Sequence, residues 1–203
     1  MNVNQRMSGA LRAFLALELP ADLLKALAAV QAELGQHGLR ARWTRPGNLH
    51  LTLKFLGDIP ADQVAIVAAA LRTTAAEHDA FELTAEGIGV FPGMRRPRVI
   101  WAGLSGAIAA LDGLQRGLEH QLHIAGFPCE ARDFHGHLTL GRFPEAPGGG
   151  IAEILSAYAA RYFGSFTVRE VVLFQSDLQA RGAVYTALAR ASLGGKNLTS
   201  ARD

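Results

Sequence analysis

The stretches His50-Leu-Thr-Leu53 and His137-Leu-Thr-Leu140 repeat the same four residues 87 positions apart, and both lie in strand-like surroundings. Successive side chains of a strand point to opposite faces of its sheet. The histidine and threonine of each copy therefore share one face, and the two leucines point to the core behind it. If the two strands meet across a groove, two histidines and two threonines converge on one volume. This repeat predicts an internally duplicated chain with one site near its pseudo-symmetry axis.

Two histidines that face each other are suited to acid–base chemistry near neutral pH. Their ordinary pKa of ~6.5 allows one to be neutral while the other is protonated. One imidazole takes a proton from an attacking hydroxyl and the other gives a proton to a leaving oxygen, each worth ~10²–10⁴-fold in rate. The threonine hydroxyls are able to donate to the non-bridging oxygens of a phosphoryl group. This scheme requires no metal.

A structural role is the main alternative for a histidine in a strand, because short patterns alone are weak evidence of function. Repetition with identical apolar neighbours favours a functional role, since a structural histidine has no reason to recur in this way. A zinc site at His50 and His137 lacks a third ligand of suitable spacing unless His135 joins them, so we expect neither a metal nor a cofactor. The other histidines are interpreted as surface residues, and the single cysteine as a small buried apolar residue: His37, His78, His120, His123 and Cys129.

Composition indicates an ordinary globular protein. The chain has 203 residues and a mass of 21.6 kDa, with 49% hydrophobic and 19% charged residues, which excludes an acidic disordered chain. The longest apolar run, Val64–Leu71, is eight residues long, far short of the ~20 residues of a membrane helix. A single cysteine excludes an internal disulfide. We therefore expect a soluble, cytoplasmic protein with no membrane partner.

The basic residues are unusual because 17 of the 20 are arginines. Two clusters stand out, Arg40-Ala-Arg42 with Arg45, and Arg95-Arg96 with Arg98. The planar fork of arginine matches phosphate oxygens bidentately, so clustered arginines in loops suit an anionic ligand. The alternative is that the chain prefers arginine to lysine on solvated faces.

Hydrophobic periodicity predicts an α+β protein. The adjacent strands 81–90 and 98–104 have the pattern of an antiparallel hairpin, which disfavours a doubly wound parallel sheet. No glycine-rich dinucleotide or P-loop sequence follows a strand. The predicted strands are 12–19, 49–56, 81–90, 98–104, 136–143, 165–174 and 183–190, and the predicted helices are 21–36, 61–77, 108–123 and 151–161.

The chain resembles the 2H phosphoesterase superfamily, and within it the RNA 2′,3′-cyclic phosphodiesterases, which are also called the 2′-5′ RNA ligase family. The paired His-Leu-Thr-Leu elements are similar to the two signature motifs of that superfamily. The resemblance extends from about Arg12 to Arg190 through further segments in family order: Phe14–Pro20, Arg42–Gly57, Gly87–Pro92, Pro97–Gly103, His137–Arg142, Leu173–Ser176 and Gly182–Tyr185.

The resemblance implies a bilobal fold in which two antiparallel sheets form a central groove with helices outside, related by a pseudo-two-fold duplication. It predicts one bilobal catalytic domain over residues 1–191, and the polar, glycine-containing composition of residues 192–203 predicts a flexible tail. It also implies a reaction, the opening of an RNA 2′,3′-cyclic phosphate to a 2′-phosphomonoester. In that reaction His50 is the proton donor and His137 the proton acceptor, while Thr52, Thr139 and Arg142 hold the phosphate.

Two features depart from the family pattern. Gly136 precedes the second histidine, where the family usually has proline. Strict alternation also places Arg142 on the leucine face of its strand, opposite His137, unless the strand ends or bulges at Gly141.

RNA with a 2′,3′-cyclic phosphate end is the expected partner, together with cyclic nucleotides, and the protein is expected to act as a monomer. Two alternatives remain open: 2′-5′ ligation of cyclic-phosphate and 5′-hydroxyl RNA ends, and binding of RNA or nucleotides without turnover. The predicted RNA-binding residues are arginines at the groove mouth and two aromatic residues that stack the terminal base: Arg42, Arg45, Arg95, Arg96, Arg98, Trp43 and Phe14.

Overall fold

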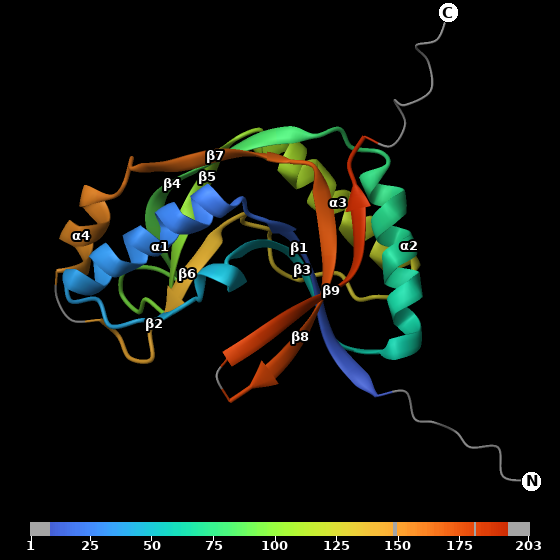
Figure 1. Ribbon diagram of the computed structural model, residues 1–203, viewed down its shortest axis with the longest axis horizontal. Helices are drawn as coiled ribbons and strands as arrows, with labels where there is room; N and C mark the ends of the chain where they lie inside the picture. Colours follow the sequence, from blue (N-terminus) through green and yellow to red (C-terminus); the bar gives the residue numbers. More distant parts are fainter. Residues whose placement is uncertain (1–8, 148–149, 181, 195–203) are drawn as a thin grey trace, which may run out of the picture.

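The computed structural model of the protein describes residues 9–147, 150–180 and 182–194. Within these residues, nine strands form one sheet, and four α-helices and two short 3-10 helices pack around it (Figure 1). The strands are β1 (Ala10–Glu18), β2 (Arg42–Trp43), β3 (His50–Pro60), β4 (Phe81–Phe91), β5 (Val99–Gly106), β6 (Leu138–Arg142), β7 (Tyr162–Val168), β8 (Glu170–Gln179) and β9 (Gly182–Ser192). The helices are α1 (Ala21–Gln36), α2 (Val64–Ala75), α3 (Ile108–Ile124) and α4 (Ile151–Ala157), with 3-10 turns η1 (Pro46–Asn48) and η2 (Ala61–Gln63).

The sheet consists of two halves that meet at the repeated motif. Its order is β7-β4-β5-β6-β3-β1-β8-β9, with β2 beside β6. We call β3-β1-β8-β9 the first half-sheet and β7-β4-β5-β6 the second half-sheet. All strand pairs are antiparallel, and β3 meets β6 at the pair Leu51–Leu138. The predicted α+β class with antiparallel sheets is confirmed, and the two expected sheets are joined into one curled sheet.

Helices α1 and α3 cross from one half-sheet to the other, whereas α2 follows β3 and packs on β8 and β9 of the same half-sheet. Helix α1 follows β1 of the first half-sheet but packs against β7 of the second. Helix α3 follows β5 of the second half-sheet but packs on α2 and contacts β3, in the layer that covers the first half-sheet. The segment Ala125–His137, which we call the crossover segment, then returns the chain to β6. These crossings lock the two half-sheets together.

Leucines at helical spacing attach α1 and α3 to the sheet. Residues Leu23, Leu27, Val30 and Leu34 of α1 are buried at intervals of three and four, as an amphipathic helix requires. Helix α3 buries a similar row. These rows join the inward leucines of the motif strands in the main core.

Both motif strands contain a bulge at the same position. In the pairing of β3 with β1, Thr52 is opposite Ala16 and Lys54 is opposite Leu15, so Leu53 has no partner. In the pairing of β6 with β5, Thr139 is opposite Trp101 and Gly141 is opposite Ile100, so Leu140 has no partner. An extra residue reverses the alternation of side chains beyond it. Each bulged leucine and the residue after it are buried, and the next residues, Phe55 and Arg142, return to the exposed face.

Two expectations from the sequence are wrong. The predicted strand 165–174 is two strands, because β7 pairs with β4 in the second half-sheet and β8 pairs with β1 in the first. The chain passes between the half-sheets at Arg169, where two adjacent charged residues, Arg169 and Glu170, interrupt the apolar pattern, a signal that the prediction of a single strand overlooked. Cys129 is exposed in the crossover segment instead of buried.

The chain ends agree only in part with the predicted tail. Strand β9 extends to Ser192, and residues 195–203 of the predicted tail lie outside the described residues. Among the helices of the described chain, none has the length and apolar character needed to cross a membrane.

The joint between the half-sheets predicts the effect of a core substitution. Leu138 is fully buried where β6 meets β3. We expect Leu138→Ala to lower the free energy of unfolding by about 2–5 kcal/mol, measured by urea denaturation, because it leaves a cavity at this joint. The control is Ile124→Ala at the exposed end of α3, for which a change within about 0.5 kcal/mol is expected. Equal effects of the two substitutions would contradict this role of the joint.

Candidate active site

Residues of both motifs line one cavity between the half-sheets. The cavity has a volume of about 310 Å³ and receives His50 and Thr52 from β3 and Thr139 and Arg142 from β6. His137 lies beside it and lines two neighbouring cavities. One of these, of about 240 Å³, also reaches Thr52, and the other, of about 460 Å³, is bounded by aromatic residues. The two predicted histidines and two predicted threonines therefore gather along one groove.

The imidazole of His50 is held by hydrogen bonds at both of its nitrogens. Its Nδ1 lies 2.8 Å from the carbonyl oxygen of Asn48, and its Nε2 lies 2.9 Å from the hydroxyl of Thr52. Because a carbonyl only accepts, the Nδ1–H donates, and in the neutral ring Nε2 is the nitrogen free to take a proton. The ring packs against Phe14 at 4.8 Å and meets the edge of Tyr185 at 5.4 Å.

The imidazole of His137 repeats this arrangement in the second half-sheet. Its Nδ1 donates to the carbonyl oxygen of His135 at 2.7 Å, again two residues before the histidine. Its ring contacts Phe91 at 5.0 Å and Trp101 at 6.3 Å. The same tautomer is therefore fixed on both sides of the groove, and each Nε2 remains available for proton transfer.

Burial lowers the pKa of both histidines below the ordinary value, because desolvation disfavours the charged ring. The hydrogen bonds to Asn48 and His135 raise the pKa values in part. Positive charge on neighbouring groups lowers them further, from His137 on His50 and from Arg142 and His135 on His137. Both rings of the free protein therefore favour the neutral form at pH 7.

Arg142 reaches the cavity because of the bulge at Leu140. Without that extra residue, alternation would place the guanidinium on the leucine face of β6. With it, Arg142 lines the same cavity as Thr139, and its charge acts on both His137 and Tyr185. The sequence predicts that Arg142 reaches the groove face only if β6 ends or bulges near Gly141, and the structure contains such a bulge.

Gly136 is explained by close packing. A Cβ at this position would lie 2.8 Å from Leu111 Cδ2 and 3.3 Å from Leu104 Cδ1. The crossover segment therefore lies tightly against α3 and β5 just before His137. A proline at this position would also carry a Cβ and would meet the same two leucines, so the absence of a Cβ at Gly136 fits their close approach.

The clustered arginines lie on and after β2 and in the turn between β4 and β5. Arg42 pairs with Arg142 across β2 and β6, and Arg45 places its guanidinium carbon 3.5 Å from where a Cβ at Gly182 would stand. The second cluster occupies the turn between β4 and β5, which the hydrogen bond from Arg98 N to Phe91 O closes. Within the described chain, the linings of the three cavities above include none of the predicted arginines Arg42, Arg45, Arg95, Arg96 and Arg98.

The two aromatic residues predicted to stack a base are largely covered. Phe14 lines the cavity but is only 3% exposed, because it stacks on Phe174 and supports His50. Trp43 is half-buried and packs over Gly141. The open aromatic ring at the cavity is Phe55, which is 58% exposed.

Sequence reasoning missed several residues that line the central cavity. Phe55 and Arg142 hold equivalent positions after the two bulges. Gly141 is a sequence signal for the bulge in β6, and no comparable glycine marks the bulge in β3. Arg12 has a weak signal, because alternation along β1 places it on the face of Phe14. The missed lining residues include Arg12, Asn48, Phe55 and Tyr185. In the described residues, no cluster of three or more histidine, cysteine or acidic side chains has the geometry to hold a metal ion.

Comparisons with known proteins find similarity over most of the chain. The family model of the LigT-like phosphoesterases matches residues 17–101 and 104–185. The RNA 2′,3′-cyclic phosphodiesterase of Methanothermobacter thermautotrophicus is 35% identical over 176 residues, which is 86% of this chain and 95% of that protein. The enzyme of the same name from Aquifex aeolicus is 32% identical and covers 77% of this chain and 84% of its own length.

Solved structures show the same similarity. The Thermus thermophilus protein TT0787 aligns with a TM-score of 0.73 and 30% identity, covering 91% of this chain and 99% of that one. E. coli LigT complexed with 3′-AMP aligns with a TM-score of 0.69 and 30% identity, covering 91% of this chain and 98% of that one.

The lowered histidine pKa values predict an acidic optimum for any reaction that uses the pair as acid and base. A neutral base is lost as pH falls through its pKa, and a protonated acid is lost as pH rises through its pKa. Because both pKa values of the free protein are lowered, the maximum of kcat/KM is expected below about pH 6.5. The pH profile of kcat/KM with a cyclic mononucleotide measures this. Tyr185→Phe is expected to keep the same profile, and a maximum above neutral pH would contradict the assignment.

Proposed function

The chain belongs to the LigT-like phosphoesterases of the 2H superfamily and is a phosphodiesterase, and we propose that it opens RNA 2′,3′-cyclic phosphate ends to 2′-phosphomonoesters. One observation carries this proposal. Two imidazoles, fixed in the same tautomer by the carbonyls of Asn48 and His135, flank a groove that also holds two threonine hydroxyls and a guanidinium. This set matches the needs of a strained phosphodiester, which already contains its leaving group.

The proposed reaction is an in-line displacement at phosphorus. His137 Nε2 takes a proton from water as the water oxygen bonds to phosphorus. The bond from phosphorus to the 3′ oxygen breaks, and protonated His50 gives its Nε2 proton to that oxygen. The threonine hydroxyls and Arg142 stabilise the negative charge that builds on the non-bridging oxygens. The allocation of acid and base between the two histidines follows the family resemblance.

Substrate binding supplies the charge state that this reaction needs. Both histidines favour the neutral form in the free protein, whereas the reaction requires one imidazolium. An anionic phosphodiester between the rings raises their pKa values, because an opposite charge nearby favours the protonated form. The histidine that acts as proton donor is therefore protonated when the phosphate enters the groove.

The flanks of the cavity suit the remainder of an RNA end. Phe55 offers an exposed ring face, and base–aromatic stacking is worth ~1–3 kcal/mol per base. Arg45 stands beside Gly182, the first residue of β9, and the next residue, Ala183, lines the cavity. We propose that Arg45 and the other clustered arginines hold the RNA backbone 5′ to the cyclic end.

Hydrolysis of a defined RNA end tests the proposed function. With an RNA oligomer that ends in a 2′,3′-cyclic phosphate, in EDTA, we expect turnover to a 2′-phosphate. His50→Ala and His137→Ala are each expected to lower kcat by about 10²–10⁴-fold, because each removes one proton-transfer group. Phosphorus NMR or enzymatic end analysis identifies the product isomer.

Three other outcomes would overturn this proposal. A 3′-phosphate product would contradict the assigned leaving group. Tight binding without turnover in all three proteins would favour an RNA-binding role. A 2′-5′ joint formed after addition of 5′-hydroxyl RNA, without hydrolysis, would favour ligation.

Length dependence tests the proposed arginine contacts. Arg45→Ala combined with Arg96→Ala is expected to raise KM for a cyclic-phosphate oligomer several-fold and to leave KM for a cyclic mononucleotide unchanged, because only the oligomer has further phosphates to contact. Steady-state kinetics on both substrates at fixed salt provide the comparison. Arg72→Ala on α2 serves as the control. Equal losses on the two substrates would refute a role in backbone binding.

A further inference from the structure

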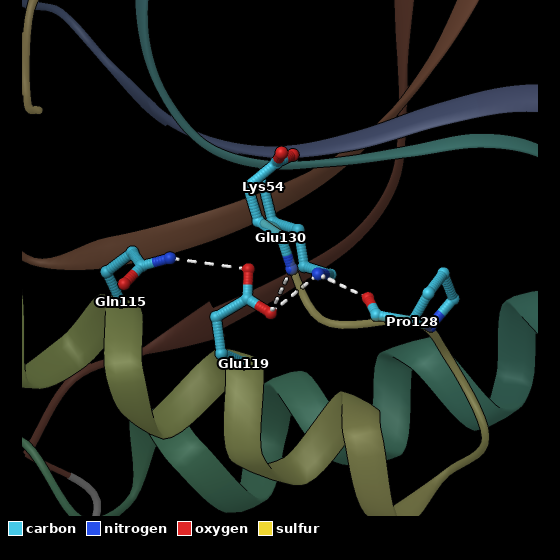
Figure 2. A network of polar contacts seen from close by, with 5 residues as sticks. All are labelled: Lys54, Gln115, Glu119, Pro128 and Glu130. Atoms are coloured by element: carbon cyan, nitrogen blue, oxygen red, sulfur yellow. Dashed lines mark hydrogen bonds and ion pairs between the residues drawn. The ribbon is translucent and has the colours of Figure 1, made fainter. Parts of the chain in front are cut away.

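A buried ion pair lies on the core side of the first motif strand, between β3 and α3, where it lines the cavity of about 240 Å³. The Lys54 side chain is 4% exposed and the Glu119 side chain 17%, and Lys54 Nζ lies 2.6 Å from Glu119 Oε2. Lys54 also donates to the carbonyl oxygen of Pro128 at 2.9 Å, as Figure 2 shows. Charged groups are rarely buried in this way because their desolvation is costly. The acid–base scheme described above uses neither residue.

The bulge at Leu53 places Lys54 in this position. Strict alternation would put Lys54 on the groove face with His50 and Thr52. The extra residue turns it to the core face, opposite Leu15. The ammonium group therefore belongs to the strand that carries the first motif, two residues after Thr52, but it faces α3.

Glu119 extends the network to the crossover segment. Gln115 Nε2 donates to Glu119 Oε1 at 3.4 Å, and the backbone N–H of Glu130 approaches Glu119 Oε2 at the same distance (Figure 2). The pair thus holds the crossover segment at two points, the carbonyl of Pro128 and the N–H of Glu130. This segment has no helix or strand of its own.

The far end of the crossover segment holds His137. The carbonyl of His135 accepts the bond from His137 Nδ1, and Gly136 lies against Leu111 of α3. A cavity of about 240 Å³ separates the two ends and is lined by Thr52, Lys54, Glu119 and His137 among others. The ion pair and the site therefore share the walls of one cavity.

We infer that Lys54 and Glu119 are positioning residues, which anchor the crossover segment to β3 and so fix the His137 imidazole relative to His50. This inference rests on the proposed function. The pair touches no substrate group and acts through the backbone that leads to His135 and His137. Displacement of a catalytic group by ~1 Å is sufficient to cost about 10²-fold in rate.

A double substitution separates positioning from stability. Removing one member of a buried pair leaves the other charge unpaired, whereas replacing both by apolar residues of similar volume is often neutral for stability. The double variant Lys54→Met/Glu119→Met is therefore expected to unfold near the wild-type temperature. Its kcat on a cyclic mononucleotide is expected to fall about 10- to 100-fold, with KM changed less than about 3-fold, because His50, Thr52 and Arg142 still bind the phosphate.

A second variant covers the case in which the double variant fails to fold. Glu119→Asp keeps the charge but shortens the side chain by one methylene, which draws the crossover segment toward α3. We expect a fall in kcat at nearly constant KM here also. The control is Glu33→Gln, which removes a carboxylate that pairs with Arg161 at a distant surface; its kcat is expected to match the wild type.

Imidazole NMR signals provide a readout that does not depend on turnover. With signals assigned from His50→Ala and His137→Ala, the double variant and Glu119→Asp are expected to shift the His137 signals and leave those of His50 in place. If kcat stays within about 2-fold of wild type and the His137 signals do not move, the pair is structural only and the inference is overturned. If wild-type protein fails to hydrolyse the cyclic phosphate while the His137 signals still shift, the proposed function fails and the anchoring stands.

Discussion

One unpaired leucine after each threonine controls the chemistry of the groove. In both motif strands this extra residue reverses the alternation of side chains, so that the histidine and threonine before it and the residue two places after it share the groove face. The bulge in β6 delivers Arg142 to the cavity of Thr139. The bulge in β3 delivers Phe55 to the same cavity and turns Lys54 into the core. The bulge occurs at the same position in both motif strands, but the residue that it directs into the cavity differs. Arg142 makes the β6 side of the cavity cationic, and Phe55 makes the β3 side aromatic.

The two histidines also depend on backbone in a second way. Each donates from Nδ1 to a carbonyl two residues earlier, which fixes the ring without adding a charged partner. A carboxylate in that place would raise the pKa of the imidazole, whereas a carbonyl raises it less than burial lowers it. The two imidazoles are therefore neutral in the free protein, and Arg12 and Arg142 make the cavity attractive to an anion. In the proposed reaction, the bound substrate raises the histidine pKa values and so provides the protonated ring.

The sequence predicts the centre of the site better than its surroundings. The repeated motif and its alternation are sufficient to bring His50, Thr52 and Thr139 to one cavity with His137 beside it, because these residues precede the bulges. Everything after a bulge escapes strict alternation, which is why Phe55 and the orientation of Lys54 were not predicted. The break between β7 and β8 was missed for another reason. Apolar residues lie on both sides of the charged pair Arg169-Glu170, and the sequence does not show that the hydrogen-bonding partner changes there. Phe14 shows a further limit of prediction from sequence. The sequence identifies an aromatic residue near the site, but it does not show that Phe174 covers its ring.

The crossing of α1 and α3 has a mechanical consequence. Each half-sheet is covered by a helix that the chain supplies from the other half, so neither half carries its own complete core. Separating the half-sheets would expose leucines on both sides of the joint at once. We therefore expect the groove walls to lack the hinge freedom of a two-domain clamp, and the distance between the two imidazoles to be set when the chain folds. A protein built in this way selects its ligand by the fit of a preformed slot, and a phosphodiester at the end of a strand enters such a slot without any closure of the fold.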